Sequence, residues 1–77
     1  MITLSDRRLK DNIQLAGVDE YTGLNLYHFN YKWGKKRFCG VMAQEVAIEF
    51  PEAVYTMGSG WLAVYYEKLG IEMKEIH

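Results

Sequence analysis

Residues 24–33 place the strongest constraint on the fold of this chain. Apolar and aromatic side chains occupy both faces of a period-2 pattern there, with Leu24, Leu26 and His28 on one face and Tyr27, Phe29, Tyr31 and Trp33 on the other. A strand of this kind has to be central in a sheet or covered by a partner. His28 has neither a second metal ligand nor an acid near it in the sequence, so we interpret it as a structural histidine.

Turn signals around this segment predict two β-hairpins. Gly34-Lys35-Lys36 is a turn, and residues 37–41 return as a second strand beside the aromatic one. Gly40 inside that strand indicates a bulge or a close approach of another group to the backbone. Farther along, a flexible glycine-serine-glycine turn separates two short β-like runs, residues 53–57 and 61–66, which form the second hairpin.

Helical periodicity predicts two short helices before the end of the chain. Leu9 and Ile13 lie four positions apart, so residues 6–14 can form a helix with one apolar edge. The second helix covers residues 43–50 and ends at Pro51. Its apolar face consists of Ala43, Val46, Ala47 and Phe50.

A third helix is predicted at residues 66–77, because apolar side chains recur there at helical spacings: Tyr66, Leu69, Met73 and Ile76. Gly70 weakens this helix by about 1 kcal/mol relative to alanine. A domain of this size buries only about 60% of its unfolded surface, and the apolar stripe has no obvious place in so small a core. We therefore expect these four side chains to form an interface between copies of the chain.

Together these patterns predict one small α+β domain over residues 1–77, built from antiparallel β-hairpins, short helices and the C-terminal helix. The net charge is −1, and the basic triplet Lys35-Lys36-Arg37 is interpreted as a solvated turn, so we expect no nucleic-acid ligand. No apolar run has the length of a membrane span, and we expect a soluble protein of a reducing cytoplasm. The single cysteine, Cys39, is expected to be structural. Without a Cys/His zinc pattern, we expect neither a metal nor a cofactor.

Ser5 and Lys10 are the side chains that we expect to carry chemistry. A serine hydroxyl is a weak nucleophile that needs a base within hydrogen-bond reach, and a desolvated lysine can serve. Positions five apart lie about 140° around a helix axis, so the pair works only if Ser5 is outside the first turn. The alternative is that Ser5 is an ordinary N-cap, followed by Asp6 in the first turn. Glu45 on the second helix either orients Lys10 or is a solvated helix acid.

Three blocks of the chain are informative in combination: Ser5-Asp6-Arg7-Arg8-Leu9-Lys10-Asp11-Asn12-Ile13, Gly40-Val41-Met42-Ala43-Gln44-Glu45-Val46 and Phe50-Pro51-Glu52-Ala53-Val54. In this order and spacing they resemble the intramolecular chaperone auto-processing domain. That domain ends bacteriophage endosialidase tailspikes, tail fibres and neck appendages, and also occurs in the myelin regulatory factor. The chain departs from the family pattern at Val64-Tyr65-Tyr66, where an acid is usual, and at His77, where the family's last helix usually runs on into a three-helix bundle.

The resemblance implies a trimer-forming chaperone that cuts itself off from the fibre before it. Carried over residue by residue, Ser5 is the nucleophile, Lys10 is the base and the Leu4–Ser5 peptide is the scissile bond, with residues 1–4 as the lead upstream of the cut. The Ser5 hydroxyl attacks the Leu4 carbonyl, and water hydrolyses the resulting ester. Trimer assembly is expected to bury Lys10, and the block at residues 40–46 is interpreted as core.

The expected function is that of an intramolecular chaperone for the assembly of a trimeric phage tail fibre or tailspike in the host cytoplasm. Its partners are the upstream fibre segment and two further copies of the chain. Self-cleavage makes it a single-turnover serine peptidase. Two alternatives stay open: a non-catalytic trimerisation or capping module of the same fold, and an unrelated small α+β binding domain.

Overall fold

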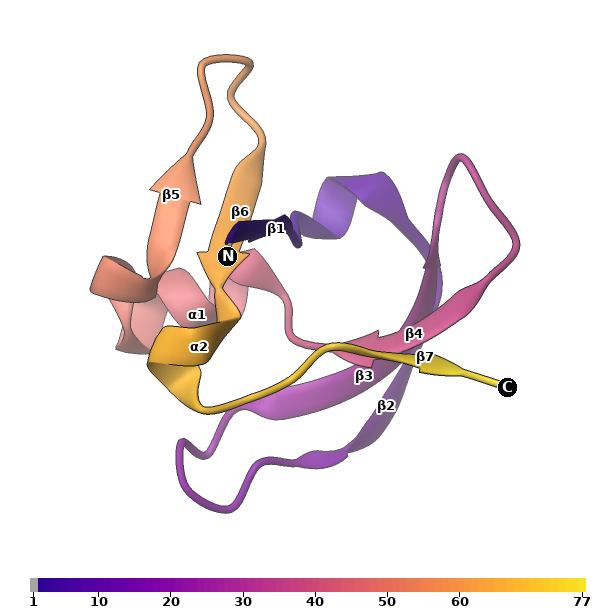
Figure 1. The fold of residues 1–77 in the computed structure, drawn as a ribbon, viewed down its shortest axis with the longest axis horizontal. Coiled ribbons are helices and arrows are strands. Elements are labelled where there is room, and N and C mark those ends of the chain that lie inside the picture. The colour runs from indigo at the N-terminus through magenta and orange to yellow at the C-terminus, as the bar shows by residue number, and fades with distance from the viewer. Residues whose placement is uncertain (1) are drawn as a thin grey trace.

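The computed structural model describes residues 2–77, which form an α+β domain with two antiparallel sheets (Figure 1). The three-stranded sheet has the order β1-β6-β5, made of Ile2–Leu4, Leu62–Tyr65 and Val54–Thr56. The four-stranded sheet has the order β2-β3-β4-β7, made of Lys10–Val18, Asn25–Tyr31, Arg37–Gly40 and Lys74–Ile76. The helical elements are α1 (Ala43–Glu49), α2 (Tyr66–Leu69) and two 3-10 turns, η1 (Arg7–Leu9) and η2 (Pro51–Ala53).

Both predicted hairpins are confirmed. Phe29 on β3 lies opposite Phe38 on β4, and Tyr55 on β5 lies opposite Ala63 on β6. Because β2 pairs with the other edge of β3, the aromatic strand is central, as its two apolar faces predict. Phe29 is fully buried and meets the ring of Tyr31 edge-on, so the strand contributes much of one hydrophobic cluster.

The helix predicted at residues 43–50 is confirmed as α1. It ends before Phe50, and Pro51 opens the 3-10 turn η2 that follows. Ala43 and Val46 are its buried side chains, and the helix packs beside β5 and β6 (Figure 1). In the described part of the chain, no helix has the length and apolar character needed to cross a membrane.

The helix predicted at residues 6–14 is wrong. After the short turn η1, the chain enters β2 and pairs with β3. Asn12 has a φ of 51°, in the left-handed region that a helix excludes, and it lies where the pairing of β2 becomes irregular. Leu9 and Ile13, whose spacing indicated a helix, pack on the cluster around Phe29. Pairing with the aromatic strand therefore outweighs a weak helical pattern.

The C-terminal helix predicted at residues 66–77 is also wrong. The helix α2 ends at Leu69 because Gly70, with a φ of 68°, forms a left-handed C-cap. The chain then adds β7 to the free edge of β4, so it ends in a strand. Tyr66 and Leu69 belong to this chain's own core, and Met73 packs partly against it. The predicted interface residues therefore form no single helical stripe, and the trimer stays a prediction.

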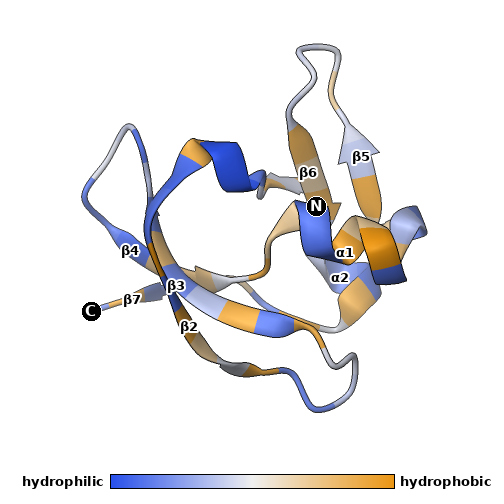
Figure 2. Cartoon of the chain, turned by 180° about the vertical axis from the view of Figure 1, so that it is seen from behind, coloured by the Kyte–Doolittle hydropathy of each residue, from blue (hydrophilic) through white to orange (hydrophobic). Residues whose placement is uncertain are grey.

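Two hydrophobic clusters meet at the segment between β4 and α1. Val41 belongs to the cluster under α1 and β6, whereas the next residue, Met42, belongs to the cluster built on Phe29 and Tyr31. Figure 2 shows the hydrophilic turn η1 following β1, in contrast to the apolar residues of β6 and α1. Polar groups of η1 therefore come to lie beside a predominantly apolar core.

Candidate active site

Ser5 follows β1 and is held by its backbone on two sides. Its N–H donates to the carbonyl of Leu62 on β6 at 3.1 Å, and its own carbonyl accepts the N–H of Ala43 at the start of α1 at 2.9 Å. The residue is fully buried, and its hydroxyl donates to the Val41 carbonyl at 2.7 Å. The alternative of Ser5 as a helix cap is not realised, because the N-cap of η1 is Asp6.

Lys10 is the first residue of β2, and η1 turns the chain so that the lysine side chain returns to Ser5. Its Nζ atom donates to Ser5 Oγ at 2.7 Å, to the Ser5 carbonyl at 2.9 Å and to the Val41 carbonyl at 2.8 Å. The same atom lies 4.2 Å from the centroid of the Phe29 ring. The structure thus brings the predicted pair together through a 3-10 turn and a strand, without the helix that we expected.

Burial makes the Lys10 ammonium unusually acidic. Lys10 is only 3% exposed. Loss of solvent lowers its pKa from 10.5 to about 7, although the negative charges of Asp6 and Glu45 act in the opposite direction. A lysine with this pKa is about half neutral at neutral pH. A single chain already buries the amine, so the trimer that we expected to supply this desolvation is not required for it.

The contacts of Lys10 suit a general base. A neutral amine has two N–H groups and one lone pair, whereas an ammonium has three N–H groups. If the carbonyls of Ser5 and Val41 accept the two N–H groups, the lone pair faces the third contact, Ser5 Oγ. The serine hydroxyl can then turn its proton from Val41 to Lys10.

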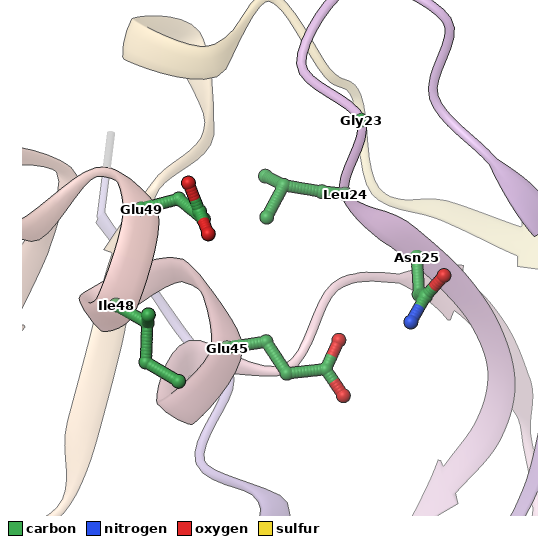
Figure 3. Close-up of a pocket in the computed structure, with 6 residues that line it drawn as sticks. All are labelled: Gly23, Leu24, Asn25, Glu45, Ile48 and Glu49. Carbon is green, nitrogen blue, oxygen red and sulfur yellow. The ribbon is translucent and has the colours of Figure 1, made fainter.

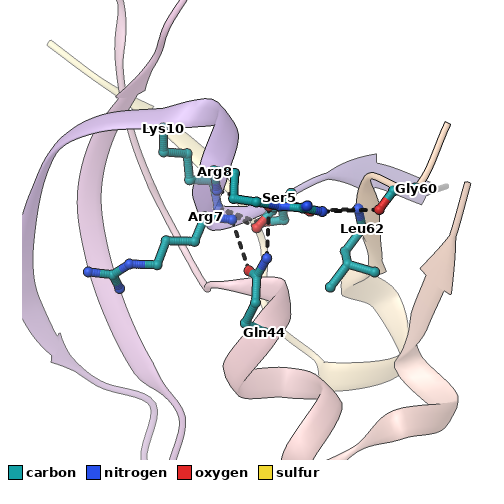
Figure 4. A network of polar contacts seen from close by, with 8 residues as sticks. Ser5, Arg7, Arg8, Lys10, Gln44, Gly60 and Leu62 are labelled. Carbon is teal, nitrogen blue, oxygen red and sulfur yellow. Dashed lines mark hydrogen bonds and ion pairs between the residues drawn. The ribbon is translucent and has the colours of Figure 1, made fainter.

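Asp6 organises the turn between the two dyad residues. Its buried carboxylate accepts five hydrogen bonds of 2.8–3.0 Å, from N, Nε and Nη2 of Arg8, from the Gln44 amide and from the Leu62 N–H. The Arg8 side chain beside it is the main reason that the pKa of Asp6 lies well below its usual range. Asp6 was a first-turn acid only in the alternative that made Ser5 an N-cap; in the structure it links η1 to α1 through Gln44 and to β6 through Leu62. Figure 4 shows Arg8, Gln44 and Leu62 of this polar network.

The block at residues 40–46, which we interpreted only as core, supplies polar atoms to the site. The Val41 carbonyl accepts hydrogen bonds from both Ser5 and Lys10. The Gln44 side chain donates to Asp6 at 2.8 Å and accepts a backbone N–H of η1 at 2.9 Å. Every residue has a backbone carbonyl, so the sequence could not indicate that the carbonyl of Val41 would bind Ser5 and Lys10.

Tyr66, which we assigned to the subunit interface, lies in the site. Its Oη atom is 2.9 Å from Ser5 Oγ and accepts the Val41 N–H at 3.2 Å. Gly40 leaves the necessary space, because a Cβ there would lie 2.6 Å from Tyr66 Oη. The close approach predicted at Gly40 is therefore confirmed. Burial raises the pKa of Tyr66, which keeps its hydroxyl protonated at neutral pH.

Tyr31 contacts the peptide bond that precedes Ser5. Its hydroxyl donates a hydrogen bond to the carbonyl of Leu4. Sequence reasoning counted Tyr31 among the apolar residues of the aromatic strand. The signal that could have singled it out is the hydroxyl itself, because a buried tyrosine normally satisfies that group with a partner.

Other residues considered from the sequence lie apart from the dyad. Glu45 accepts a hydrogen bond from the Tyr27 hydroxyl, and within residues 2–77 no hydrogen bond joins it to Lys10. His28 and Cys39 are cross-strand neighbours on β3 and β4. Burial raises the pKa of the Cys39 thiol, which disfavours the reactive thiolate.

A shallow pocket of about 250 Å³ lies between α1 and the start of β3 (Figure 3). Its lining consists of Gly23, Leu24, Asn25, Glu45, Ile48 and Glu49. Neither dyad residue lines it, so the pocket is separate from the Ser-Lys chemistry. Among the residues that the structure describes, no group of three or more His, Cys, Asp or Glu side chains could hold a metal ion.

The buried Ser5 hydroxyl and the Lys10 amine are within hydrogen-bond distance of each other, as a serine nucleophile and its base require. The family model for peptidase S74, described as chaperone of endosialidase, matches residues 5–55. The chain belongs to this family. The match to the S74 chaperone model begins at Ser5 and includes Lys10 and Tyr31, whereas Tyr66 lies beyond it. No curated protein and no solved structure gave a significant match.

Proposed function

We propose that this S74 chaperone domain cuts its own Leu4–Ser5 peptide bond. The observation that supports the proposal is the 2.7 Å contact between Lys10 Nζ and Ser5 Oγ in a buried setting. General-base catalysis needs a base within hydrogen-bond reach whose pKa lies near the working pH. Lys10 meets both requirements, because it touches the hydroxyl and its pKa is about 7.

The proposed reaction is an N-to-O acyl shift followed by hydrolysis. Lys10 takes the proton of Ser5 Oγ as that oxygen bonds to the carbonyl carbon of Leu4. The peptide C–N bond then breaks, and the Lys10 ammonium returns the proton to the departing Ser5 nitrogen. Leu4 is now an ester on Ser5 Oγ. Water hydrolyses this ester, which leaves a carboxylate on Leu4 and a free hydroxyl and amine on Ser5.

The biological role that we propose is assembly of a trimeric phage tail fibre or tailspike segment upstream of the domain, in the host cytoplasm. Membership of the endosialidase chaperone family supports this role. The proposed homotrimer now rests mainly on the family. Of the four predicted interface residues, Tyr66 and Leu69 are buried within one chain, and Met73 and Ile76 keep some exposed surface.

A fibre segment fused upstream of Met1 tests the cleavage. The segment should be released with a new N-terminus at Ser5, and Ser5→Ala or Lys10→Ala should each stop the cut in a folded domain. Lys10→Arg is the sharper variant, because a guanidinium stays protonated and cannot take the serine proton. A new terminus at another residue, or full cleavage in Lys10→Arg, would rule out this mechanism.

Family membership removes one of the two alternatives, the unrelated binding domain. The other, a non-catalytic trimerisation or capping module, has a distinct outcome in the same experiment. A folded trimer that never releases the fused segment would favour it over the self-cleaving chaperone. Intact mass of the purified fusion and its sedimentation behaviour separate these two results.

A further inference from the structure

The Leu4–Ser5 peptide group is held by a hydrogen bond on each side. The Ser5 N–H donates to the Leu62 carbonyl at 3.1 Å, and the Leu4 carbonyl accepts the hydroxyl of Tyr31 on β3. In an antiparallel ladder, the residue beside a hydrogen-bonded pair turns its carbonyl away from the partner strand. Leu4, opposite Ala63, occupies that position. Its oxygen therefore points away from β6, and Tyr31 meets it there.

Tyr31 is fixed in place by other aromatic rings. It stacks on Trp33 with centroids 4.7 Å apart and planes 13° apart, and it meets Phe29 edge-on at 5.4 Å and Phe38 at 5.7 Å. It is only 8% exposed, and burial raises the pKa of its hydroxyl well above the usual range, so the group stays a donor. A donor positioned before the reaction needs no reorganisation when negative charge develops on its acceptor.

We propose that Tyr31 is a third catalytic residue, which stabilises the oxyanion formed on the Leu4 carbonyl. This inference rests on the proposed self-cleavage. As Ser5 Oγ bonds to the Leu4 carbon, an electron pair of the carbonyl moves onto its oxygen, and the Tyr31 hydrogen bond strengthens without transfer of the proton. The pair returns when the peptide C–N bond breaks. The same hydroxyl serves the same oxygen when water attacks the ester.

The other polar side chains of the site act on a different atom. Lys10 and Tyr66 both contact Ser5 Oγ, which is the nucleophile. Within residues 2–77, Tyr31 is the side chain that donates to the Leu4 oxygen. Activation of the nucleophile and stabilisation of the oxyanion are thus assigned to separate residues. Loss of the Tyr31 hydroxyl should lower the rate without changing the titration of Lys10.

Release of residues 1–4 from the full chain, measured by intact mass after refolding from denaturant, tests the inference. Tyr31→Phe removes the hydroxyl and keeps the ring. We expect cleavage to slow about 10²–10³-fold, as for the loss of one oxyanion donor, with an unchanged pH midpoint. Tyr27→Phe is the matched control. It also removes a hydroxyl from β3, but the Tyr27 hydroxyl donates to Glu45 and does not contact the scissile peptide. It should cleave at the unmodified rate.

Each outcome bears on the assignment. An unmodified rate in Tyr31→Phe would overturn it, and so would a shifted pH midpoint, because the tyrosine would then act through Lys10. Substitution of 3-fluorotyrosine at position 31 keeps the hydroxyl, makes it a stronger donor and should accelerate cleavage; an equal or lower rate would count against the oxyanion role. If the unmodified chain releases nothing, the proposed function fails, and the role of Tyr31 fails with it.

Discussion

The rate of self-cleavage should follow the titration of Lys10. If the neutral amine is the base, the rate rises with pH and levels off above a midpoint near 7, the pKa that burial imposes. About 10% of such lysines are neutral one pH unit below the midpoint and about 90% one unit above it. The rates at pH 6 and pH 8 should therefore differ by about tenfold. A solvated lysine would instead give about a tenfold rise per unit up to pH 9 and beyond.

The same burial makes the free energy of unfolding depend on pH. The folded pKa of Lys10, about 7, lies below its ordinary value of 10.5, so the unfolded chain binds more protons between these values. Stability should therefore rise as the pH increases from about 7 to 10.5. At ~1.4 kcal/mol per pH unit, the rise has an upper bound of roughly 5 kcal/mol. Urea unfolding of Ser5→Ala, which cannot cleave, measures it, with Ser5→Ala/Lys10→Met as the reference that lacks this titration.

The rate measurement uses refolded chains, so the reaction starts at a known time. Samples taken from pH 5 to 9 are quenched in acid and analysed by intact mass, while circular dichroism confirms folding at each pH. Ser5→Ala should show only the uncut mass throughout. A rate that does not change between pH 6 and 8, or one that still rises tenfold per unit at pH 9, would refute the role of a desolvated Lys10.

The remaining predictions concern the supports of the site and the assembly. Gly40→Ala should slow cleavage, because its Cβ would lie 2.6 Å from Tyr66 Oη. Gly17→Ala is the control and should cleave normally, because its Cβ would have no atom within 4 Å. Equal cleavage rates in the two variants would contradict the need for space at Gly40. Asp6→Asn should lower stability by about 1–3 kcal/mol in urea unfolding, because the amide is uncharged and its NH2 group cannot accept the hydrogen bonds that one carboxylate oxygen accepts. An unchanged midpoint would contradict the role of Asp6 in linking η1 to α1 and β6. Sedimentation equilibrium should show a trimer that Met73→Asp weakens, and a monomer would count against the assembly role.

The hairpins and α1 could be predicted because their signals are local. Turn residues around Gly34 and Gly58 set where strands reverse, and Pro51 sets where a helix stops. The two wrong helices also had local signals, but their outcome depended on distant partners. Leu9 packs against the aromatic cluster of β3, and the segment after Gly70 pairs with the open edge of β4. The spacing of apolar residues within a segment cannot predict which distant segment it will pack against or pair with.

The contact between Ser5 and Lys10 could be predicted because a serine nucleophile requires a base within reach, whatever the local structure. The groups that position it could not, since each is defined by packing across the chain. Asp6 resembles any acid in a first turn until Arg8 and Gln44 surround its carboxylate. Tyr31 and Tyr66 resemble core aromatics until their hydroxyls reach Leu4 and Ser5 respectively. Hydrogen bonds between segments that are far apart in the chain are therefore the part of a site that is hardest to predict from a single sequence.

Under the proposed function, the dispersed origin of the site makes cleavage conditional on folding. Ser5 follows β1, Lys10 opens β2, Tyr31 ends β3, Val41 follows β4, and Tyr66, 61 residues beyond the serine, opens α2. In an unfolded chain the lysine is solvated, keeps its ordinary pKa and stays charged, so the hydroxyl has no base. The carbonyl of Leu4 likewise has no fixed donor. The bond can therefore break only after both sheets have formed around it, which is the order that an assembly chaperone requires: the domain folds first and separates from its client afterwards.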